Sequence, residues 1–247
     1  MTNSLEQTRT VGVVIPAFNE ANNLFLVLNT VCAVEWLQQI IVVDDGSRDA
    51  TFEVAQRVAR HDNRLVVIHL PQNQGKAAAM LAGVQALHTD LVIFLDADLV
   101  GLKPTHLEQM ASNHLSGSYD MVIAVFQVGR AITNVTQRLI PQLSGQRCLW
   151  REEAEQALIP LAADRYGVET GLNIYAKQHH WRVKKIIWRG ISHHMIYQKR
   201  KVIAGIHNRL QMYGQIMTVI ARNRYGNRRW FARGRSTKKF RAFLNSR

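Results

Sequence analysis

Several features are scarce or missing in this chain of 247 residues, and each absence excludes a class of protein. Its two cysteines, Cys32 and Cys148, are too few for a disulfide framework, so we expect a reducing, cytoplasmic compartment. The start of the chain is polar, and its first apolar run, residues 11–16, is too short for an export signal or a membrane span. We therefore expect neither a secreted protein nor an integral membrane protein.

Acidic residues are missing from the last part of the chain. Glu169 is the final acid, and residues 171–247 contain 19 Lys or Arg and no Asp or Glu. The preceding part holds 12 basic and 18 acidic residues, so its charge has the opposite sign. The two parts therefore face different partners, or the basic part meets an anion that the acidic part does not.

The first half of the chain contains a regular alternation of short apolar runs and segments with helical periodicity. With 47% hydrophobic residues, the chain is long enough to bury a full core, and one domain is the expectation. Nearly continuous apolar strands that alternate with helices indicate a parallel sheet covered on both faces, which is an α/β fold. The predicted strands are residues 11–15, 40–43, 65–69 and 91–95.

Two pairs of acidic residues end two of these apolar runs. Asp44 and Asp45 follow "IIVV", and Asp96 and Asp98 follow "VIFL". Ligands of a parallel sheet bind beyond the carboxyl ends of its strands, where both pairs fall. Carboxylates at i and i+2 can hold a hard divalent cation such as Mg²⁺ or Mn²⁺, which keeps positions open for phosphate oxygens. The alternative is a turn with capping acids, above all for Asp44 and Asp45, because "DGS" is ordinary turn chemistry.

The segment "NQGKAAAM" adds a second candidate for anion binding. Gly75 and Lys76 open an Ala-rich helix, where backbone N–H groups, the positive helix end and an ammonium group meet. The same pattern also fits an ordinary helix start. No "GxxxxGK[ST]" motif is present, which counts against a nucleoside triphosphatase, and "PAFNEANN" replaces the Gly-rich loop that a nucleotidyltransferase typically has after its first strand.

Four segments, in this order and spacing, resemble the donor half of family 2 glycosyltransferases with the GT-A fold: "VVIPAFNEANNL", "IIVVDDGSRDAT", "NQGKAAAMLAG" and "VIFLDADL". The resemblance implies a Rossmann-like half that binds a nucleoside diphosphate sugar. It also implies a lining for base and ribose, an ammonium near the diphosphate, and a metal held by the acidic pair. The residues so implied are Pro16, Ala17, Glu20, Asp44 and Asp45 for the base and ribose, Gly75 and Lys76 for the diphosphate, and Asp96, Ala97 and Asp98 for the ribose and metal.

The second half is similar to the acceptor-side motifs of glucosyl-3-phosphoglycerate synthases, and the motifs of the chain also resemble those of bacterial enzymes of the dolichyl-phosphate mannosyltransferase type. The matching segments are "PQLSGQRCLWRE" and "YGVETGLNIYAKQHHWRV". The resemblance places Ser144, Gly145 and Arg147 near the acceptor and turns the carboxylate of Glu169 toward the acceptor hydroxyl. It assigns the third metal ligand to His193, with His194 as the second choice.

The chemistry of the acceptor-side residues is compatible with a role in the site and also with an ordinary structural role. The planar fork of Arg147 suits a phosphate or carboxylate on an acceptor, or it belongs to a surface or helix-start arginine. Glu169 is a candidate base, or the ion-pair partner of one of the many cations that follow it. The donor-half motifs favour inversion at the sugar and the acceptor-half motifs favour retention, so both outcomes stay open.

We expect residues 1–195 to form the catalytic domain, with a donor half at 10–104 and an acceptor half at 105–195, and residues 196–247 to form a basic extension. Apolar residues recur at spacings of three or four over 203–220, which predicts a helix packed on the domain or lying on an anionic membrane at its inner face. The tail 222–247 interleaves arginine with aromatic residues. A cationic protein that binds nucleic acid or a membrane on a transferase-like fold is the alternative function, with nucleic acid the less expected partner.

The expected activity is metal-dependent transfer of a sugar from a UDP-glucose-type or GDP-mannose-type donor. The expected acceptor is anionic, either a small phosphorylated molecule or a lipid. The basic tail does not map onto the acceptor site of the phosphoglycerate enzymes, which puts phosphoglycerate as acceptor in doubt. A homodimer would be unsurprising.

Overall fold

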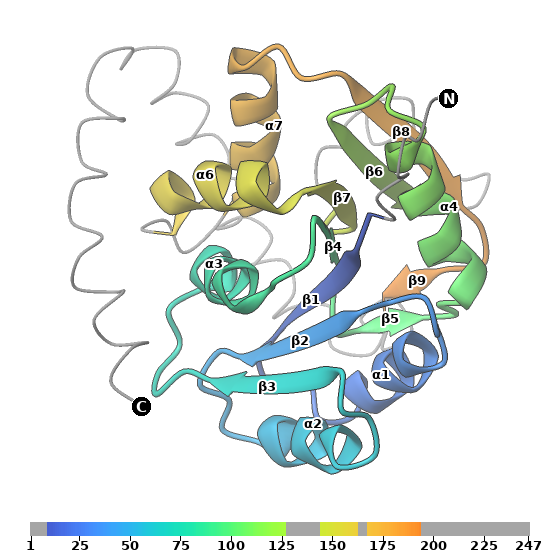
Figure 1. Ribbon diagram of the computed structural model, residues 1–247. Coiled ribbons are helices and arrows are strands. Elements are labelled where there is room, and N and C mark those ends of the chain that lie inside the picture. The colour runs from blue at the N-terminus through green and yellow to red at the C-terminus, as the bar shows by residue number, and fades with distance from the viewer. Residues whose placement is uncertain (1–8, 127–143, 163–166, 194–247) are drawn as a thin grey trace, which may run out of the picture.

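The computed structural model describes residues 9–126, 144–162 and 167–193 as a layered α/β structure (Figure 1). The predicted basic helix at 203–220 and the tail beyond it lie outside the described residues. The elements of the described part, in chain order, are β1 (Val11–Ala17), α1 (Leu24–Cys32), β2 (Gln39–Asp44), α2 (Thr51–Ala59), β3 (Leu65–His69), α3 (Lys76–Ala86), β4 (Leu91–Phe94), β5 (Leu99–Val100), α4 (Pro104–Leu115), β6 (Met121–Phe126), β7 (Arg147–Trp150), α6 (Arg151–Leu161), α7 (Val168–Gln178), β8 (Val183–Trp188) and β9 (Ser192–His193).

A central sheet of seven strands has the order β3-β2-β1-β4-β7-β6-β8. All neighbours pair in parallel except β7, which runs antiparallel to both β4 and β6. A separate two-stranded ribbon pairs β5 with β9. The four predicted strands are confirmed as β1 to β4, and the sheet is mostly parallel, as the alternation of apolar runs indicates.

The sheet is buried on both faces, which explains why its strands are apolar at every position. Along β1, Val13 and Ile15 point into one core cluster, where they meet Leu24 and Leu28 of α1. Val14 points into the other cluster, which contains the apolar residues of α3, α6 and α7. Helices α1, α2 and α4 therefore cover one face and α3, α6 and α7 cover the other (Figure 1).

Helix α3 carries mostly small side chains, because it packs closely against the centre of the sheet. Its residues 77–84 are all buried. A β-carbon on Gly83 would lie 2.4 Å from a methyl group of Val14, so the backbone of α3 contacts β1 closely. This close packing fixes the start of the helix, and with it Lys76, at the carboxyl end of β1.

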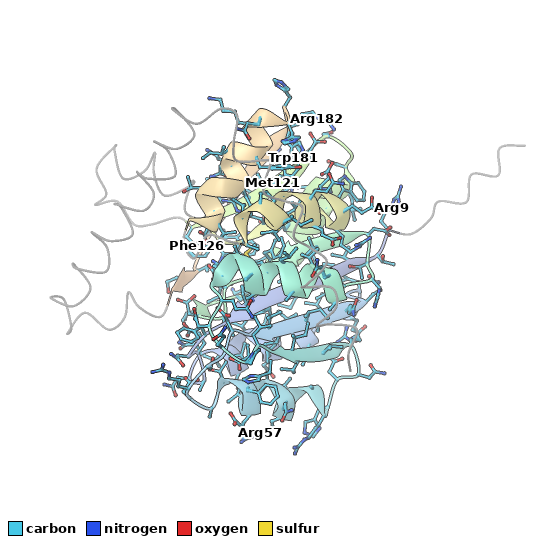
Figure 2. All side chains as sticks on the ribbon, turned by 90° about the vertical axis from the view of Figure 1, so that its left-hand side faces the viewer. Arg9, Arg57, Met121, Phe126, Trp181 and Arg182 are labelled. Carbon is cyan, nitrogen blue, oxygen red and sulfur yellow. The ribbon has the colours of Figure 1, made fainter. Side chains whose placement is uncertain are left out.

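The amino ends of the parallel strands lie on one side of the molecule and their carboxyl ends lie on the opposite side. Arg9, before β1, and Phe126, at the end of β6, lie on opposite sides in Figure 2. Arg57, on α2 beside β3, and Arg182, before β8, mark the two ends of the strand order. In the part of the chain that the structure describes, no helix combines the length and apolar character needed to cross a bilayer.

Candidate active site at the carboxyl edge of the sheet

The predicted site residues come together at the carboxyl edge of the sheet. β1 ends in Pro16 and Ala17, β2 ends at Asp44, and Asp96 follows β4 by two residues. The antiparallel strand β7 begins here rather than ending here, so Arg147 and the residues before it join the same edge. The topology therefore unites the donor-side and acceptor-side motifs that the sequence separates.

The first acidic pair lies inside the protein and holds loops together. Asp44 is fully buried, and its Oδ2 lies 2.7 Å from His69 Nδ1. Asp45 is 3% exposed and accepts the backbone N–H groups of Gln74 and Gly75 at 2.7 and 2.8 Å. The Gly75 N–H, which the sequence suggested for a ligand anion, is thus bound by the chain's own carboxylate.

The loops that carry Asp45 and Gly75 approach each other closely. Gly46 lies between them with a φ of +67°, in the left-handed region that favours glycine. A β-carbon on Gly46 would lie 2.6 Å from the backbone carbonyl carbon of Gln72, so a residue with a side chain does not fit at this position. The "DDGS" and "NQGK" motifs therefore form one joined structure at the sheet edge.

The "PAFNE" loop is linked to the turn after β2. The Asn19 N–H donates to Ser47 Oγ at 2.9 Å, and the Glu20 N–H donates to Thr51 Oγ1 at 2.8 Å. Pro16 is half-buried and Ala17 is buried, while Phe18 between this pair and Asn19 is 41% exposed. Phe18 is an apolar side chain open to solvent beside the predicted ribose lining, and the sequence analysis did not single it out.

The centre of the site is a closed ring of hydrogen bonds that joins both halves of the predicted catalytic domain. Lys76 Nζ lies 2.6 Å from Asp96 Oδ1 and 2.6 Å from Glu169 Oε1. The ring is completed by Arg147 Nη2 to the Glu169 carbonyl at 3.1 Å, Arg147 Nε to the Ser144 carbonyl at 3.2 Å, Ser144 Oγ to Gln146 Oε1 at 2.9 Å, and Gln146 Nε2 to Asp96 Oδ2 at 2.6 Å.

Lys76 is held as a cation by this arrangement. Burial alone would lower the pKa of Lys76, but the charges of Asp96 and Glu169 and their hydrogen bonds outweigh it, so the pKa is raised. The ammonium is therefore charged at neutral pH. Its side chain is still 33% exposed, which leaves it accessible to a ligand at the sheet edge.

Arg147 lies inside the protein. It is 0% exposed, and its Nη1 donates to Asn173 Oδ1 at 2.8 Å in addition to its two ring contacts. Burial lowers the pKa of Arg147 to about 10, while Glu169 and Asp96 oppose the shift, so the guanidinium remains charged at neutral pH. Arg147 donates hydrogen bonds to the Ser144 and Glu169 carbonyls and to Asn173, and its role at the acceptor stays a prediction.

Glu169 is placed by the start of α7. Gly167 precedes the helix with a left-handed φ of 87°, and Glu169 lies in the first turn, where the helix dipole favours a carboxylate. The side chain of Glu169 is 18% exposed. The ion pair with Lys76 is the alternative that the sequence offered for Glu169, and its role as a base stays a prediction.

The loop before Arg147 forms a tight seat for Asp96. A β-carbon on Gly145 would lie 2.5 Å from Asp96 Oδ1 and 2.6 Å from Oδ2, so the carboxylate packs directly on the glycine backbone. Ser144 is buried, and its hydroxyl is within hydrogen-bonding reach of the Ala124 carbonyl on β6. Gln146, which sequence reasoning missed, is fully buried and bonds to Asp96. The only signal in the sequence was its place inside the Ser-Gly-x-Arg loop.

Backbone pairing brings the segment after Asp98 next to the segment that contains His193. Asp98 is half-buried and follows the buried Ala97, and the next residue, Leu99, pairs with His193 across the β5–β9 ribbon. The main chain of His193 therefore lies opposite that of Leu99, although 94 positions separate the two in sequence, and a metal held by Asp98 and His193 stays a prediction. His194 lies outside the described residues.

The chemistry of this donor set fits Mg²⁺ or Mn²⁺. Carboxylate oxygen and imidazole nitrogen are accepted ligands of Mn²⁺, and carboxylates suit Mg²⁺. Among the side chains that the structure describes, no cluster of three or more His, Cys, Asp or Glu is found. Both oxygens of Asp96 accept hydrogen bonds, from Lys76 and from Gln146, so this carboxylate is already oriented within the site.

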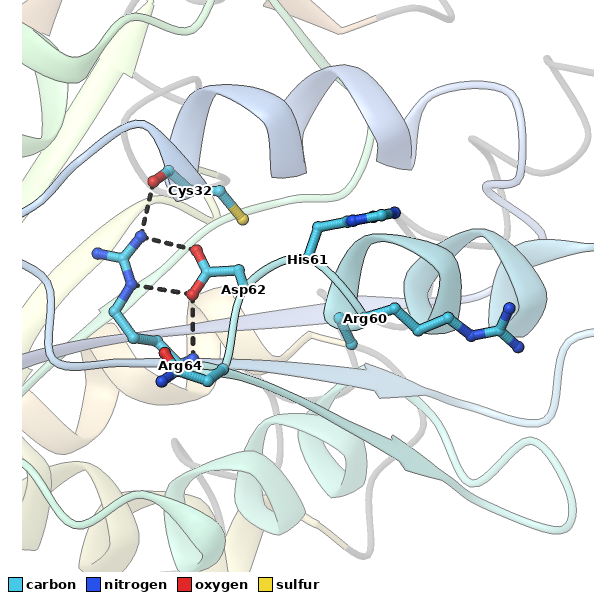
Figure 3. A pocket seen from close by; sticks show the side chains of 7 residues that line it. Cys32, Arg60, His61, Asp62 and Arg64 are labelled. Carbon is cyan, nitrogen blue, oxygen red and sulfur yellow. Dashed lines mark hydrogen bonds and ion pairs between the residues drawn. The ribbon is translucent and has the colours of Figure 1, made fainter.

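A cavity of about 600 Å³ lies at the opposite edge of the sheet, between the ends of α1 and α2 (Figure 3). There Arg64 forks onto Asp62 at 3.0 and 2.7 Å and donates to the Cys32 carbonyl at the end of α1 at 2.6 Å. Burial, with Asp62 beside it, raises the pKa of Cys32 to about 12, so the thiol is a weak nucleophile. These contacts satisfy a backbone carbonyl at the end of α1, and they lie far from the predicted site at the carboxyl edge of the sheet.

Comparison with known proteins identifies the family. Residues 12–205 match the family model described as "Glycosyl transferase family 2". The chain belongs to this family. The resemblance that its motifs carry is therefore confirmed.

Curated members of family 2 match part of the chain. The undecaprenyl-phosphate 4-deoxy-4-formamido-L-arabinose transferase of Photorhabdus laumondii is 38% identical over 124 residues, which cover 48% of this chain and 38% of that protein. The protein of the same name from Pseudomonas syringae is 44% identical over 94 residues, which cover 36% and 28%. The matched stretch thus spans less than half the length of these relatives.

Solved structures match over more of the chain and support the GT-A fold. Glucosyl-3-phosphoglycerate synthase from Mycobacterium tuberculosis, in complex with Mn²⁺, UDP and phosphoglyceric acid, aligns with a TM-score of 0.60 and 20% identity. The alignment covers 85% of this chain and 78% of that one. The same enzyme with Mg²⁺ and UDP aligns with a TM-score of 0.53 and 22% identity, over 75% and 72%. At this identity the likeness concerns the fold.

Proposed function

We propose that this glycosyltransferase is metal-dependent and transfers a hexosyl group from a nucleoside diphosphate sugar, of the UDP-glucose or GDP-mannose type, to an anionic acceptor. The observation that carries the proposal is the closed ring, because it joins Lys76 and Asp96 of the donor half to Glu169 of the acceptor half within hydrogen-bonding distance. Residues 1–195 form the catalytic unit in this proposal, and 196–247 form a basic extension.

The donor would bind at the carboxyl ends of β1, β2 and β4. The joined loops that carry Asp44, Asp45 and Glu20 would wall the base and ribose, with Pro16 and Ala17 at the end of β1. Lys76 would turn from its carboxylate partners toward the diphosphate, since the ammonium lies at the start of α3 and is partly exposed. Asp96 would orient the ribose and the metal.

Mg²⁺ or Mn²⁺ would be held by Asp98, Asp96 and His193, whose main chain pairs with that of Leu99, the residue after Asp98. When bound, the cation supplies positive charge that stabilises the diphosphate leaving group as its bond to the sugar breaks. Support for this part comes from the fold relatives, which have been crystallised with Mn²⁺ or Mg²⁺ and UDP.

In the transfer step, the bond between the sugar's anomeric carbon and the diphosphate oxygen breaks, and a bond from that carbon to an acceptor oxygen forms. If the acceptor is a hydroxyl, its proton passes to the carboxylate of Glu169. If the acceptor is a phosphate, its attacking oxygen is already ionised at neutral pH and needs no base. Arg147 would position Glu169 through its bond to the Glu169 carbonyl, while Ser144 and Gly145 shape the acceptor side of the ring.

Two classes of anionic acceptor follow from the relatives. The names of the curated relatives specify undecaprenyl phosphate, and the fold relative was crystallised with phosphoglyceric acid. We favour the lipid phosphate because 19 basic and no acidic residues follow position 170, which suits an anionic membrane surface. The enzyme would then work at the inner face of the membrane as a peripheral protein.

A transfer assay tests the proposed function. The purified chain is incubated with Mn²⁺, with UDP-glucose or GDP-mannose, and with either a polyprenyl phosphate or phosphoglyceric acid, and products are identified by mass spectrometry. The proposal predicts a glycosylated polyprenyl phosphate that is absent when the cation is chelated. Transfer to phosphoglyceric acid alone would overturn the lipid acceptor, and no transfer from any donor would contradict the function.

A further inference from the structure

Gln146 is a fully buried amide in the loop between β6 and β7. Its Nε2 donates to Asp96 Oδ2 at 2.6 Å, and its Oε1 lies 2.9 Å from Ser144 Oγ. Both ends of the amide are therefore engaged. A reversed amide would turn its oxygen toward the Asp96 carboxylate, which can only accept hydrogen bonds when ionised, so this environment allows one orientation.

The partner of this amide, Asp96, is held from three sides. Gln146 binds Oδ2, Lys76 Nζ binds Oδ1 at 2.6 Å, and the backbone of Gly145 leaves no space even for a β-carbon next to the carboxyl group. Only Gln146 among these three holds the carboxylate through a neutral side-chain donor. A hydrogen bond from a neutral amide fixes a carboxylate while leaving its charge in place.

The neutrality of Gln146 matters for a cation site. Lys76 already places one positive charge beside Asp96. A second cation at position 146 would reduce the attraction of the acidic pair for a divalent metal, whereas an amide orients Asp96 without adding charge. The Ser144 hydroxyl lies within reach of Gln146 Oε1 and of the Ala124 carbonyl on β6, and it can donate its single proton to one of these oxygens at a time, so the amide is held next to the rigid sheet.

We propose that Gln146 is a positioning residue that fixes the carboxylate of Asp96 for the metal and nucleotide of the donor. The proposal rests on the function proposed above. It adds a residue of the acceptor-side loop to the donor site, so the two halves are coupled through an uncharged contact as well as through Lys76.

A double-mutant cycle in the metal-free protein tests the contact itself. Gln146→Met, Asp96→Asn and the double variant are unfolded with urea, and their free energies of unfolding are compared with the wild type. If the amide acts through Asp96, the loss in the double variant is smaller than the sum of the two single losses. Additive losses would overturn the proposal, because they would show that Gln146 acts independently of Asp96.

Binding of UDP and of GDP in the presence of Mn²⁺, measured by calorimetry, tests the positioning role. Loss of a residue that orients a metal-site ligand costs about 10–100-fold in affinity, and we expect this loss for Gln146→Met with the nucleotide that the wild type binds. Asp96→Asn should lose affinity as well, and the double variant should bind no more weakly than Asp96→Asn alone.

Gln146→Glu provides the second variant, and Gln85→Met the matched control. The glutamate has the size of the native side chain but sets a carboxylate against Asp96, so it should weaken binding more than Gln146→Met does. If Gln146→Met fails to fold, this variant carries the test. Gln85 on α3 also donates to a carboxylate, that of Glu155 at 3.2 Å, away from the site, and its loss should leave nucleotide affinity unchanged.

The outcomes separate this proposal from the proposed function. Wild-type affinity in both Gln146 variants, together with a loss in Asp96→Asn, would overturn the role of Gln146 and leave the donor site intact. A folded wild type that binds neither UDP nor GDP with Mn²⁺ would overturn the proposed function, and the role of Gln146 with it.

Discussion

Lys76 Nζ and Glu169 Oε1 lie 2.6 Å apart, although 93 positions separate the two residues in sequence. Lys76 begins α3 on the donor side, and Glu169 lies in the first turn of α7 on the acceptor side. The same ammonium binds Asp96, so one cation balances a carboxylate from each half. A ligand diphosphate that attracts Lys76 would therefore loosen its hold on both carboxylates at once.

Replacement of Lys76 by methionine should weaken both the site and the fold. Two partly buried carboxylates, those of Asp96 and Glu169, would lose their shared cation, which we expect to cost about 1–3 kcal/mol of unfolding free energy. The affinity for a nucleoside diphosphate should fall by about tenfold or more, as expected for a lost charged hydrogen bond. Urea unfolding and calorimetry measure the two effects.

Lys177→Met is the control for this change. Lys177 lies near the end of α7 with an exposed side chain, so the substitution removes one positive charge without touching the ring. Its stability and nucleotide affinity should match the wild type. Equal losses in the two variants would show that net charge, rather than the bridge between Asp96 and Glu169, accounts for the effect.

Gly145→Ala should damage the site more than its small size suggests. The added methyl group would lie 2.5 Å from Asp96 Oδ1, so the carboxylate or the loop has to move. We expect metal-dependent nucleotide binding to weaken by about tenfold or more, the range for a displaced metal-site ligand. Gly117→Ala serves as the comparison, because its β-carbon would meet nothing within 4 Å while its φ of +75° makes alanine strained.

The comparison separates lost stability from lost geometry. Gly117→Ala should lower the free energy of unfolding by about 1 kcal/mol and leave nucleotide affinity unchanged. If Gly145→Ala binds nucleotide as well as Gly117→Ala does, the tight seat for Asp96 has no part in donor binding.

The fold was predictable because its signals are local. The apolar runs that became β1 to β4 have the composition of strands buried on both faces, and the acids that follow them mark the sheet edge. The family motifs assigned Lys76, Asp96 and Glu169 to one active site, and the structure places the three side chains in contact. Their mutual contacts were not predictable, since a pairing over 93 positions depends on how α7 packs.

Other parts of the site needed the three-dimensional structure. The burial of Arg147 was not predictable, because it depends on β7 running antiparallel between β4 and β6. The bonds from the N–H groups of Gln74 and Gly75 to Asp45 were not predictable either, because they join two loops that are distant in sequence. Gln146 gave no signal, because an amide that orients another side chain has no sequence pattern of its own.

Glu169→Gln distinguishes the two classes of acceptor. Glutamine keeps an oxygen that can accept from Lys76 but cannot take a proton. If the acceptor is a hydroxyl, transfer should fall by about 10²–10⁴-fold, the contribution of general base catalysis. If the acceptor is a phosphate, as we propose, the turnover number should change little, because no proton has to be removed. Initial rates of transfer to a polyprenyl phosphate decide between the two. A fall of about 10²–10⁴-fold in Glu169→Gln would contradict a phosphate acceptor.

His114 should make the stability of the protein sensitive to acid. It is 1% exposed, with Nε2 at 3.2 Å from the Asp120 carbonyl, and burial lowers its pKa below the usual 6.5 although Asp120 opposes the shift. The unfolded chain therefore binds a proton at this residue more readily than the folded chain does. The stability that neutral His114 contributes is present above about pH 6.5 and is lost as the pH falls below it.

His114→Phe tests this dependence. Phenylalanine keeps a ring against Trp150, which His114 meets edge-on at 5.0 Å, and removes the titrating group. The urea midpoint of the wild type should fall more steeply between pH 7.5 and 5.5 than that of the variant. His106, whose pKa burial also lowers, is present in both proteins and cancels from the comparison. Parallel curves would rule out His114 as the source.

The most direct test of the donor site is calorimetric titration of the protein with a panel of UDP-sugars and GDP-sugars, with and without Mn²⁺, alongside Asp98→Ala. Asp98 is chosen because it is a proposed metal ligand and directly precedes β5, in which Leu99 pairs with His193. We predict that one donor binds, that binding requires the cation, and that Asp98→Ala loses it while remaining folded. A folded wild type that binds no nucleotide sugar, or an Asp98→Ala variant that binds as tightly as the wild type, would contradict the account.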